Sequence, residues 1–103
     1  MPNRRLETRA PVDFFVNKYI DGYPYLCHAE NMSWQGLLMS RTIEPAVDRP
    51  LLALEMGLPG VDRPIWVWAK PVWTAERQQA FRFMGLDEHD GDLLARYLDS
   101  LAA

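Results

Sequence analysis

The stretch V-D-F-F-V-N-K-Y-I-D-G-Y-P-Y-L-C-H-A-E-N, residues 12–31, decides the fold class of this 103-residue chain. Its first part, Val12–Ile20, is rich in the aromatic and β-branched residues that favour strands. The dipeptide Asp21-Gly22 that follows is typical of a two-residue hairpin turn. Tyr23–Asn31 then resumes the strand-like pattern, so the stretch predicts an antiparallel hairpin.

The chain continues as short strand-like runs separated by turn residues. Within 65–70 the pattern alternates and places Trp66 and Trp68 on one face, and Pro71 is expected to bend this strand before it resumes. Six or seven short strands with no helix between them indicate an all-β antiparallel barrel or sandwich. The further strands are expected at residues 36–41, 51–56, 65–70 with 72–74, and 80–84.

The last segment changes to helical spacing. Its apolar residues recur three and four positions apart, and Asp90 or Asp92 is expected to cap the start of the helix. We therefore expect one amphipathic helix at about 88–102, packed against the β domain. The apolar stripe consists of Leu93, Leu94, Tyr97, Leu98 and Leu101.

Length and composition indicate one compact domain. Hydrophobic residues make up 49% and charged residues 24%, as in ordinary globular domains. No apolar run approaches the roughly 20 residues that would cross a bilayer, and no apolar segment follows the basic start, so neither membrane insertion nor secretion is expected. Cys27 is the single cysteine, which fits a buried structural thiol and a cytoplasmic location.

Charge is unevenly distributed along the chain. The net charge of −3 argues against a protein that grips a nucleic-acid polymer through many phosphates. Within the first ten residues, however, Arg4, Arg5 and Arg9 face one acid, Glu7. Residues 1–10 lack periodicity and are expected to form a flexible arm, with the β domain at 11–103. A cationic arm on an acidic body suits a small anionic ligand.

Two short motifs stand out. Arg5 and Arg9 form an Arg-x-x-x-Arg pair, and Asn31, Ser33 and Gly36 form Asn-x-Ser-x-x-Gly beginning 22 positions after Arg9. Each motif is unspecific by itself, because basic arms are common and Asn, Ser and Gly are routine turn residues. Together, before the first strand and after the second strand of a small β domain, they are much more specific.

On these motifs the chain resembles the PilZ family. The resemblance covers nearly the whole chain and implies a six-stranded antiparallel barrel, with a C-terminal helix, that receives cyclic di-GMP. By the same resemblance, Arg5 and Arg9 would contact guanine and phosphate, and Asn31, Ser33 and Gly36 would form the barrel-side floor. The resemblance also implies that Arg4 favours two stacked nucleotides over one. No cofactor or metal is expected besides this ligand.

The chemistry of the motif residues agrees with this ligand. A guanidinium group can donate two parallel hydrogen bonds to the Hoogsteen edge of guanine and can clamp a phosphate diester. Asn31 and Ser33 are expected to point the same way from an extended segment, with Met32 inward. Gly36 lets a ligand or the returning backbone approach closely.

The tryptophans are expected either to pack in the core or to contact a ligand. Most are expected in the core, with Trp34 packing, but Trp73 follows the Pro71 bend, where some PilZ relatives place a Trp against the nucleotide. Ligand contact and core packing are equally favoured for Trp73. The chain departs from the family at Gln78-Gln79-Ala80, where relatives often have a glycine, so the register of the last hairpin is expected to change.

The sequence offers little support for a metal site or an enzyme. Residues 87–90, Asp-Glu-His-Asp, are expected to cap the helix and not to bind a metal, and no serine has a His-Asp context, so no enzyme is expected. The receptor would act on a separate, unidentified effector protein. The alternatives are a ligand-independent PilZ-like interaction module, for example in type IV pilus assembly, and a barrel that binds single-stranded nucleic acid.

Overall fold

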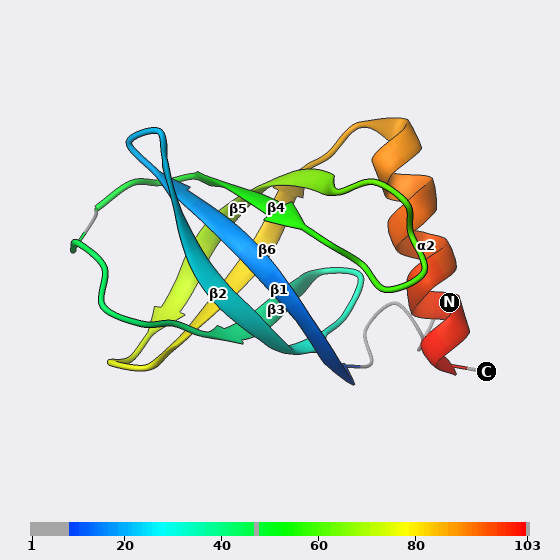
Figure 1. The fold of residues 1–103 in the computed structure, drawn as a ribbon, viewed down its shortest axis with the longest axis horizontal. Coiled ribbons are helices and arrows are strands. Elements are labelled where there is room, and N and C mark those ends of the chain that lie inside the picture. The colour runs from blue at the N-terminus through cyan, green and yellow to red at the C-terminus, as the bar shows by residue number, and fades with distance from the viewer. Residues whose placement is uncertain (1–8, 47, 103) are drawn as a thin grey trace.

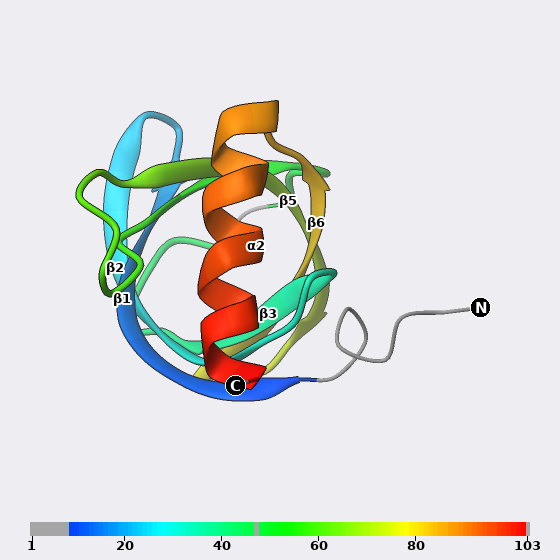
Figure 2. The same cartoon turned by 90° about the vertical axis from the view of Figure 1, so that its right-hand side faces the viewer.

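The computed structural model describes residues 9–46 and 48–102 as a closed antiparallel barrel with one helix. Around the barrel the strands follow the order β1-β2-β3-β6-β5-β4 (Figure 1). The helix α2 lies across one end of the barrel (Figure 2). The predicted architecture is confirmed. The elements are β1 (Ala10–Ile20), β2 (Tyr23–Met32), β3 (Gly36–Ser40), β4 (Leu52–Met56), β5 (Ile65–Thr74), β6 (Gln78–Gly85) and α2 (Glu88–Ala102).

The first hairpin forms as its turn residues predict. Asp21 and Gly22 both have positive φ, 51° and 85°, which matches the backbone twist of the two flanking strands. Ile20 pairs with Tyr23 across the turn. The predicted arm, residues 1–10, lies outside the described residues except for its last two positions, and β1 begins at Ala10.

The core fills the barrel and extends beneath the helix. Leu94 and Tyr97 from the predicted stripe are buried, and the ring of Tyr97 meets Phe14 edge-on with 5.9 Å between centroids. Leu101 is 36% exposed, so the stripe packs along its first two turns. None of the helices in the described ranges is long and apolar enough to span a membrane. The most deeply buried apolar side chains are Val16, Met32, Leu37, Met39, Leu54, Met56, Ile65 and Phe81.

The helix begins three residues earlier than a cap at Asp90 would require. The carboxylate of Asp87 accepts a hydrogen bond from the backbone N–H of Asp90, so Asp87 is the cap. Asp90 is instead 2% exposed, and its two oxygens accept from Arg63 Nη2 and from the backbone N–H of Trp66. Asp90 therefore ties the helix to the start of β5, and the prediction of Asp90 or Asp92 as cap was wrong.

The expectation that Trp66 and Trp68 belong to the core was also wrong. They share one face of β5, as predicted, but this is the outer face, where they are 42% and 56% exposed. The inward positions of β5 are held by smaller residues, which fit the narrow interior of a six-stranded barrel. Trp34 does pack against the core, as expected.

The last hairpin has the irregular register that its sequence suggested. β5 runs without a break through Pro71, but its pairing with β6 shifts between Pro71 and Trp73. β6 begins at Gln78, two residues before the predicted start, because Gln79 is buried and hydrogen-bonded inside the barrel. Proline donates no ladder hydrogen bond, which explains why the irregularity falls beside it.

Cys27 is buried at 3% exposure, as predicted, and its environment has a measurable consequence. Burial raises the pKa of the Cys27 thiol from 9.0 to about 11; the charge of Lys18 lowers the pKa by a smaller amount, and that of Glu44 raises it. The unfolded chain therefore ionises first as the pH rises. We expect the stability advantage of the wild type over Cys27→Ala to be complete well below pH 9 and to fall by about 2 kcal/mol by pH 11. Urea unfolding of both proteins across this pH range measures the difference in their free energies of unfolding. A difference that does not change with pH would contradict the prediction.

Candidate functional site

The two sequence motifs meet at the start of β1. Arg9 Nη1 donates a hydrogen bond to Asn31 Oδ1 at 3.0 Å, across 22 positions of sequence. The register explains the contact, because Ala10 pairs with Met32 and Pro11 with Asn31. Both groups lie at an exposed position on the barrel. Arg4 and Arg5, the other predicted contacts of the arm, lie outside the described residues.

Ser33 does not share an extended segment with Asn31, contrary to expectation. β2 ends at Met32, which points inward as predicted, and Ser33 begins the turn into β3. The hydroxyl of Ser33 accepts from the backbone N–H of Gln35 at 3.1 Å, and the Ser33 N–H donates to the carbonyl of Gly36. Ser33 is 3% exposed and shapes the turn. Its contact with a ligand stays a prediction.

Gly36 is required by the returning backbone, one of its two predicted roles. A Cβ at this position would lie 2.0 Å from the carbonyl oxygen of Phe81 and 3.2 Å from Cα of Arg82 on β6. Strand β3 therefore pairs closely with β6 only because Gly36 has no side chain. The glycine sets the floor beside Asn31, while direct approach of a ligand to it stays a prediction.

Trp73 belongs to the same outer surface as Asn31. The pairings Asn31 with Leu38, Leu38 with Ala80, and Ala80 with Trp73 form one row across β2, β3, β6 and β5. Three strand spacings separate the ends of this row, about 14 Å. Trp73 is 50% exposed, so of its two predicted roles core packing is excluded and ligand contact stays open. Leu38 and Ala80 lie between Asn31 and Trp73 in this row and form an apolar floor.

Two cations on this face were missed by the sequence analysis. Lys70 on β5 and Arg82 on β6 are direct cross-strand partners, and both are exposed. Among the described residues neither forms an ion pair. Like charges placed opposite each other destabilise a sheet, so an anion bound between them would relieve the repulsion. Arg82 also pairs with Gly36, which brings this cation pair beside the motif residues. The alternation of 65–70 placed Lys70 on the face of Trp66 and Trp68, but only the barrel showed that this face is outward, and only the register made Arg82 its neighbour.

The resulting face combines cations, an amide, an aromatic ring and a small apolar floor on the outside of a barrel. A helix covers one end of that barrel (Figure 2). The architecture defines a small six-stranded β-barrel domain in which the motif residues Arg9 and Asn31 meet on the outer surface.

A family comparison assigns this class. The family model of the PilZ domain matches residues 3–100, so the chain belongs to the PilZ family. The fold is similar to the crystal structure of the PilZ domain of CeSA from a cellulose-synthesizing bacterium, with a TM-score of 0.73 at 15% sequence identity. The match covers 93% of this chain and 99% of that one. No curated protein matches the sequence.

Proposed function

We propose that this PilZ domain is a receptor for cyclic di-GMP that binds the dinucleotide on the outer face of β2, β3, β6 and β5. The hydrogen bond between Arg9 and Asn31 carries the proposal, because it joins the two ligand motifs at one exposed position. Lys70 and Arg82 beside them, which form no ion pair within residues 9–46 and 48–102, supply positive charge for the phosphates. The chain as a whole has a net charge of −3, so this face differs in sign from the rest of the protein.

Each group has a defined role in the proposed complex. Arg9 would donate to guanine or phosphate from a position already oriented by Asn31. Trp73 would stack on a purine at the far end of the row, since base–aromatic stacking contributes about 1–3 kcal/mol. Arg4 and Arg5 would complete the cationic set, and Gly36 would keep the floor low.

Ligand binding would change what a partner protein meets on this face. The free face presents exposed cations, whereas the occupied face would present cations neutralised by the phosphates of the ligand. The exposed Trp66 and Trp68 offer an apolar surface on the same barrel, and Tyr19 packs against Trp66 with 5.1 Å between ring centroids. These aromatic residues favour a protein contact both for the receptor and for the alternative, a ligand-independent interaction module.

Isothermal titration with cyclic di-GMP tests the proposal. We expect saturable binding in the micromolar range, about −8 kcal/mol, because the favourable contacts must offset the ordering of the ligand and arm. GMP, which offers one base and one phosphate, is expected to bind at least about tenfold more weakly. The titration also resolves one from two nucleotides per chain. Absence of both heat and thermal stabilisation at saturating ligand would leave the interaction module as the better explanation.

A further inference from the structure

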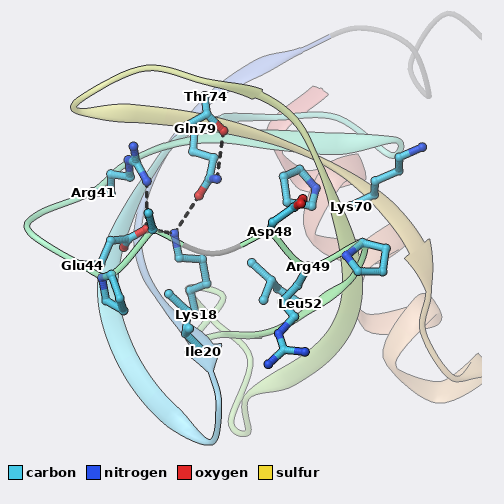
Figure 3. A pocket seen from close by; sticks show the side chains of 14 residues that line it. Lys18, Ile20, Arg41, Glu44, Asp48, Arg49, Leu52, Lys70, Thr74 and Gln79 are labelled. Atoms are coloured by element: carbon cyan, nitrogen blue, oxygen red, sulfur yellow. Dashed lines mark hydrogen bonds and ion pairs between the residues drawn. The ribbon is translucent and has the colours of Figure 1, made fainter.

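Side chains at the barrel end opposite α2 line a cavity of about 460 Å³ (Figure 3). The cavity lies between the end of β1, the β5–β6 hairpin and residues 41–46 and 48–50, which follow β3. Its size falls in the range of small-molecule sites. The cavity lies at the other end of β1 from the Arg9–Asn31 contact, although its lining shares Lys70 with the proposed dinucleotide site.

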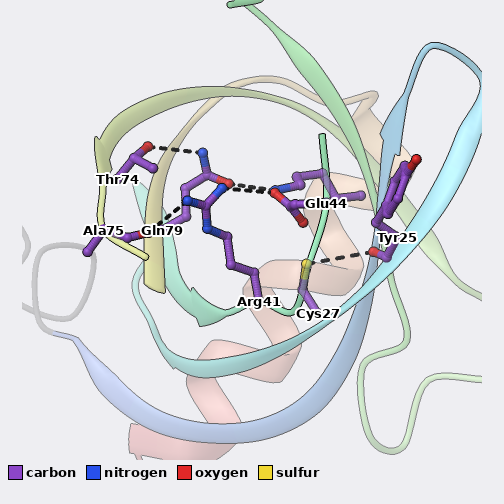
Figure 4. Close-up of polar contacts among 8 residues, drawn as sticks. Tyr25, Cys27, Arg41, Glu44, Thr74, Ala75 and Gln79 are labelled. Atoms are coloured by element: carbon purple, nitrogen blue, oxygen red, sulfur yellow. Dashed lines mark hydrogen bonds and ion pairs between the residues drawn. The ribbon is translucent and has the colours of Figure 1, made fainter. Parts of the chain in front are cut away.

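A buried polar network forms one wall of the cavity. Lys18 projects into the barrel at 1% exposure, where its amine forms an ion pair with Glu44 and donates to Gln79 Oε1 at 2.7 Å. Arg41 Nη1 donates to the same Glu44 oxygen at 3.1 Å, and Nη2 donates to the carbonyl of Ala75 at 2.8 Å (Figure 4). The Glu44 carboxylate thus bridges two cations, one from β1 and one from the segment that follows β3.

This network is incomplete in both charge and hydrogen bonding. Lys18 and Arg41 carry two positive charges, and Glu44 supplies one negative charge. Arg41 Nε and Glu44 Oε2 are buried without a hydrogen-bond partner among the described residues. A buried charge and an unsatisfied polar atom are costly unless a further group compensates them. An anionic acceptor would compensate the excess positive charge and accept a hydrogen bond from Arg41 Nε, whereas Glu44 Oε2 needs a donor such as a hydroxyl group.

We propose that this cavity is a second ligand site, which takes a small anion with a phosphate or carboxylate head group. The head group would share Lys18 and Arg41 with Glu44, and the remaining cavity would hold a body of at most small-metabolite size. Arg41, with 18% of its side chain exposed, provides the accessible part of the cation pair. A cationic ligand is not expected, because it would be repelled by Lys18 and Arg41, and the Glu44 carboxylate is already paired with both.

Amide NMR titrations with inorganic phosphate and with citrate, at constant ionic strength, test the site and separate the two head groups. We expect saturable shifts at Lys18, Arg41 and Gln79 with at least one of the two anions. Lys18→Met keeps the shape of the side chain and is expected to weaken binding by about tenfold. Glu44→Gln removes the internal carboxylate that competes with the anion, and it is expected to tighten anion binding by about tenfold. Loss of structure could only weaken binding, so a gain in affinity would point to the proposed site.

Two controls separate this site from general electrostatics and from the dinucleotide site. Arg77→Gln removes an exposed cation at the same end of the barrel that does not line the cavity, and binding should be unchanged. Arg9→Ala should also leave anion binding intact. Shifts that stay linear in anion concentration with both anions, weakening by Arg9→Ala instead of Lys18→Met, or no gain with Glu44→Gln would overturn the proposal.

Discussion

Replacing Arg9 by alanine is expected to weaken cyclic di-GMP binding by about 10- to 100-fold. A bidentate contact between arginine and guanine contributes about 1–3 kcal/mol, and each 1.4 kcal/mol is tenfold in affinity. Arg9 is the described member of the arginine pair and is already aligned by Asn31 at 3.0 Å. Isothermal titration of the variant measures the loss, and a thermal melt of the free variant should show little change because the hydrogen bond is exposed.

Two further variants define what Arg9 contributes. Arg9→Lys keeps the charge but loses the planar fork, so it should recover only part of the lost affinity. Arg96→Ala removes an exposed arginine from α2, away from the motif residues, and should bind as the wild type does. An Arg9→Ala variant that binds within twofold of the wild type would show that the motif contact is not part of a ligand site.

Replacing Gly36 by alanine is expected to destabilise the fold by about 3 kcal/mol or more. The new Cβ would meet the carbonyl oxygen of Phe81 at 2.0 Å, and a backbone atom cannot turn aside as a side chain can. Strand β3 must therefore separate from β6, which weakens the pairing of Leu37 with Phe81 next to it. Urea unfolding monitored by tryptophan fluorescence gives the free energy change.

The same substitution at Gly91 provides the control. Gly91 lies within α2, and a Cβ there would meet nothing within 4 Å. Alanine in a helix interior is more favourable than glycine by about 0.5–1 kcal/mol, so Gly91→Ala should stabilise the protein. Opposite signs at the two glycines would tie the effect to the β3–β6 contact. A Gly36→Ala variant as stable as the wild type would mean that the two strands can separate at little cost.

Part of the candidate site could be predicted from local patterns. The Arg-x-x-x-Arg and Asn-x-Ser-x-x-Gly spacings indicated that Arg9 and Asn31 belong together, and their hydrogen bond agrees. Lys70 and Arg82 had no such signal, because their opposition depends on a register shift between Trp68 and Ala69 and on where β6 begins. Their proximity is a property of the closed sheet.

The sequence by itself determined the elements of this protein, since alternation, the Asp21-Gly22 turn and helical spacing act over a few neighbouring residues. Only the tertiary structure decided which side of each strand faces inward. It placed Trp66 and Trp68 outside and Lys18 inside, where Glu44 and Gln79 come from segments 26 and 61 positions away. A six-stranded barrel has room for few large side chains, and a buried amine is tolerated only where distant partners converge on it. Such convergence exists only once the barrel has closed.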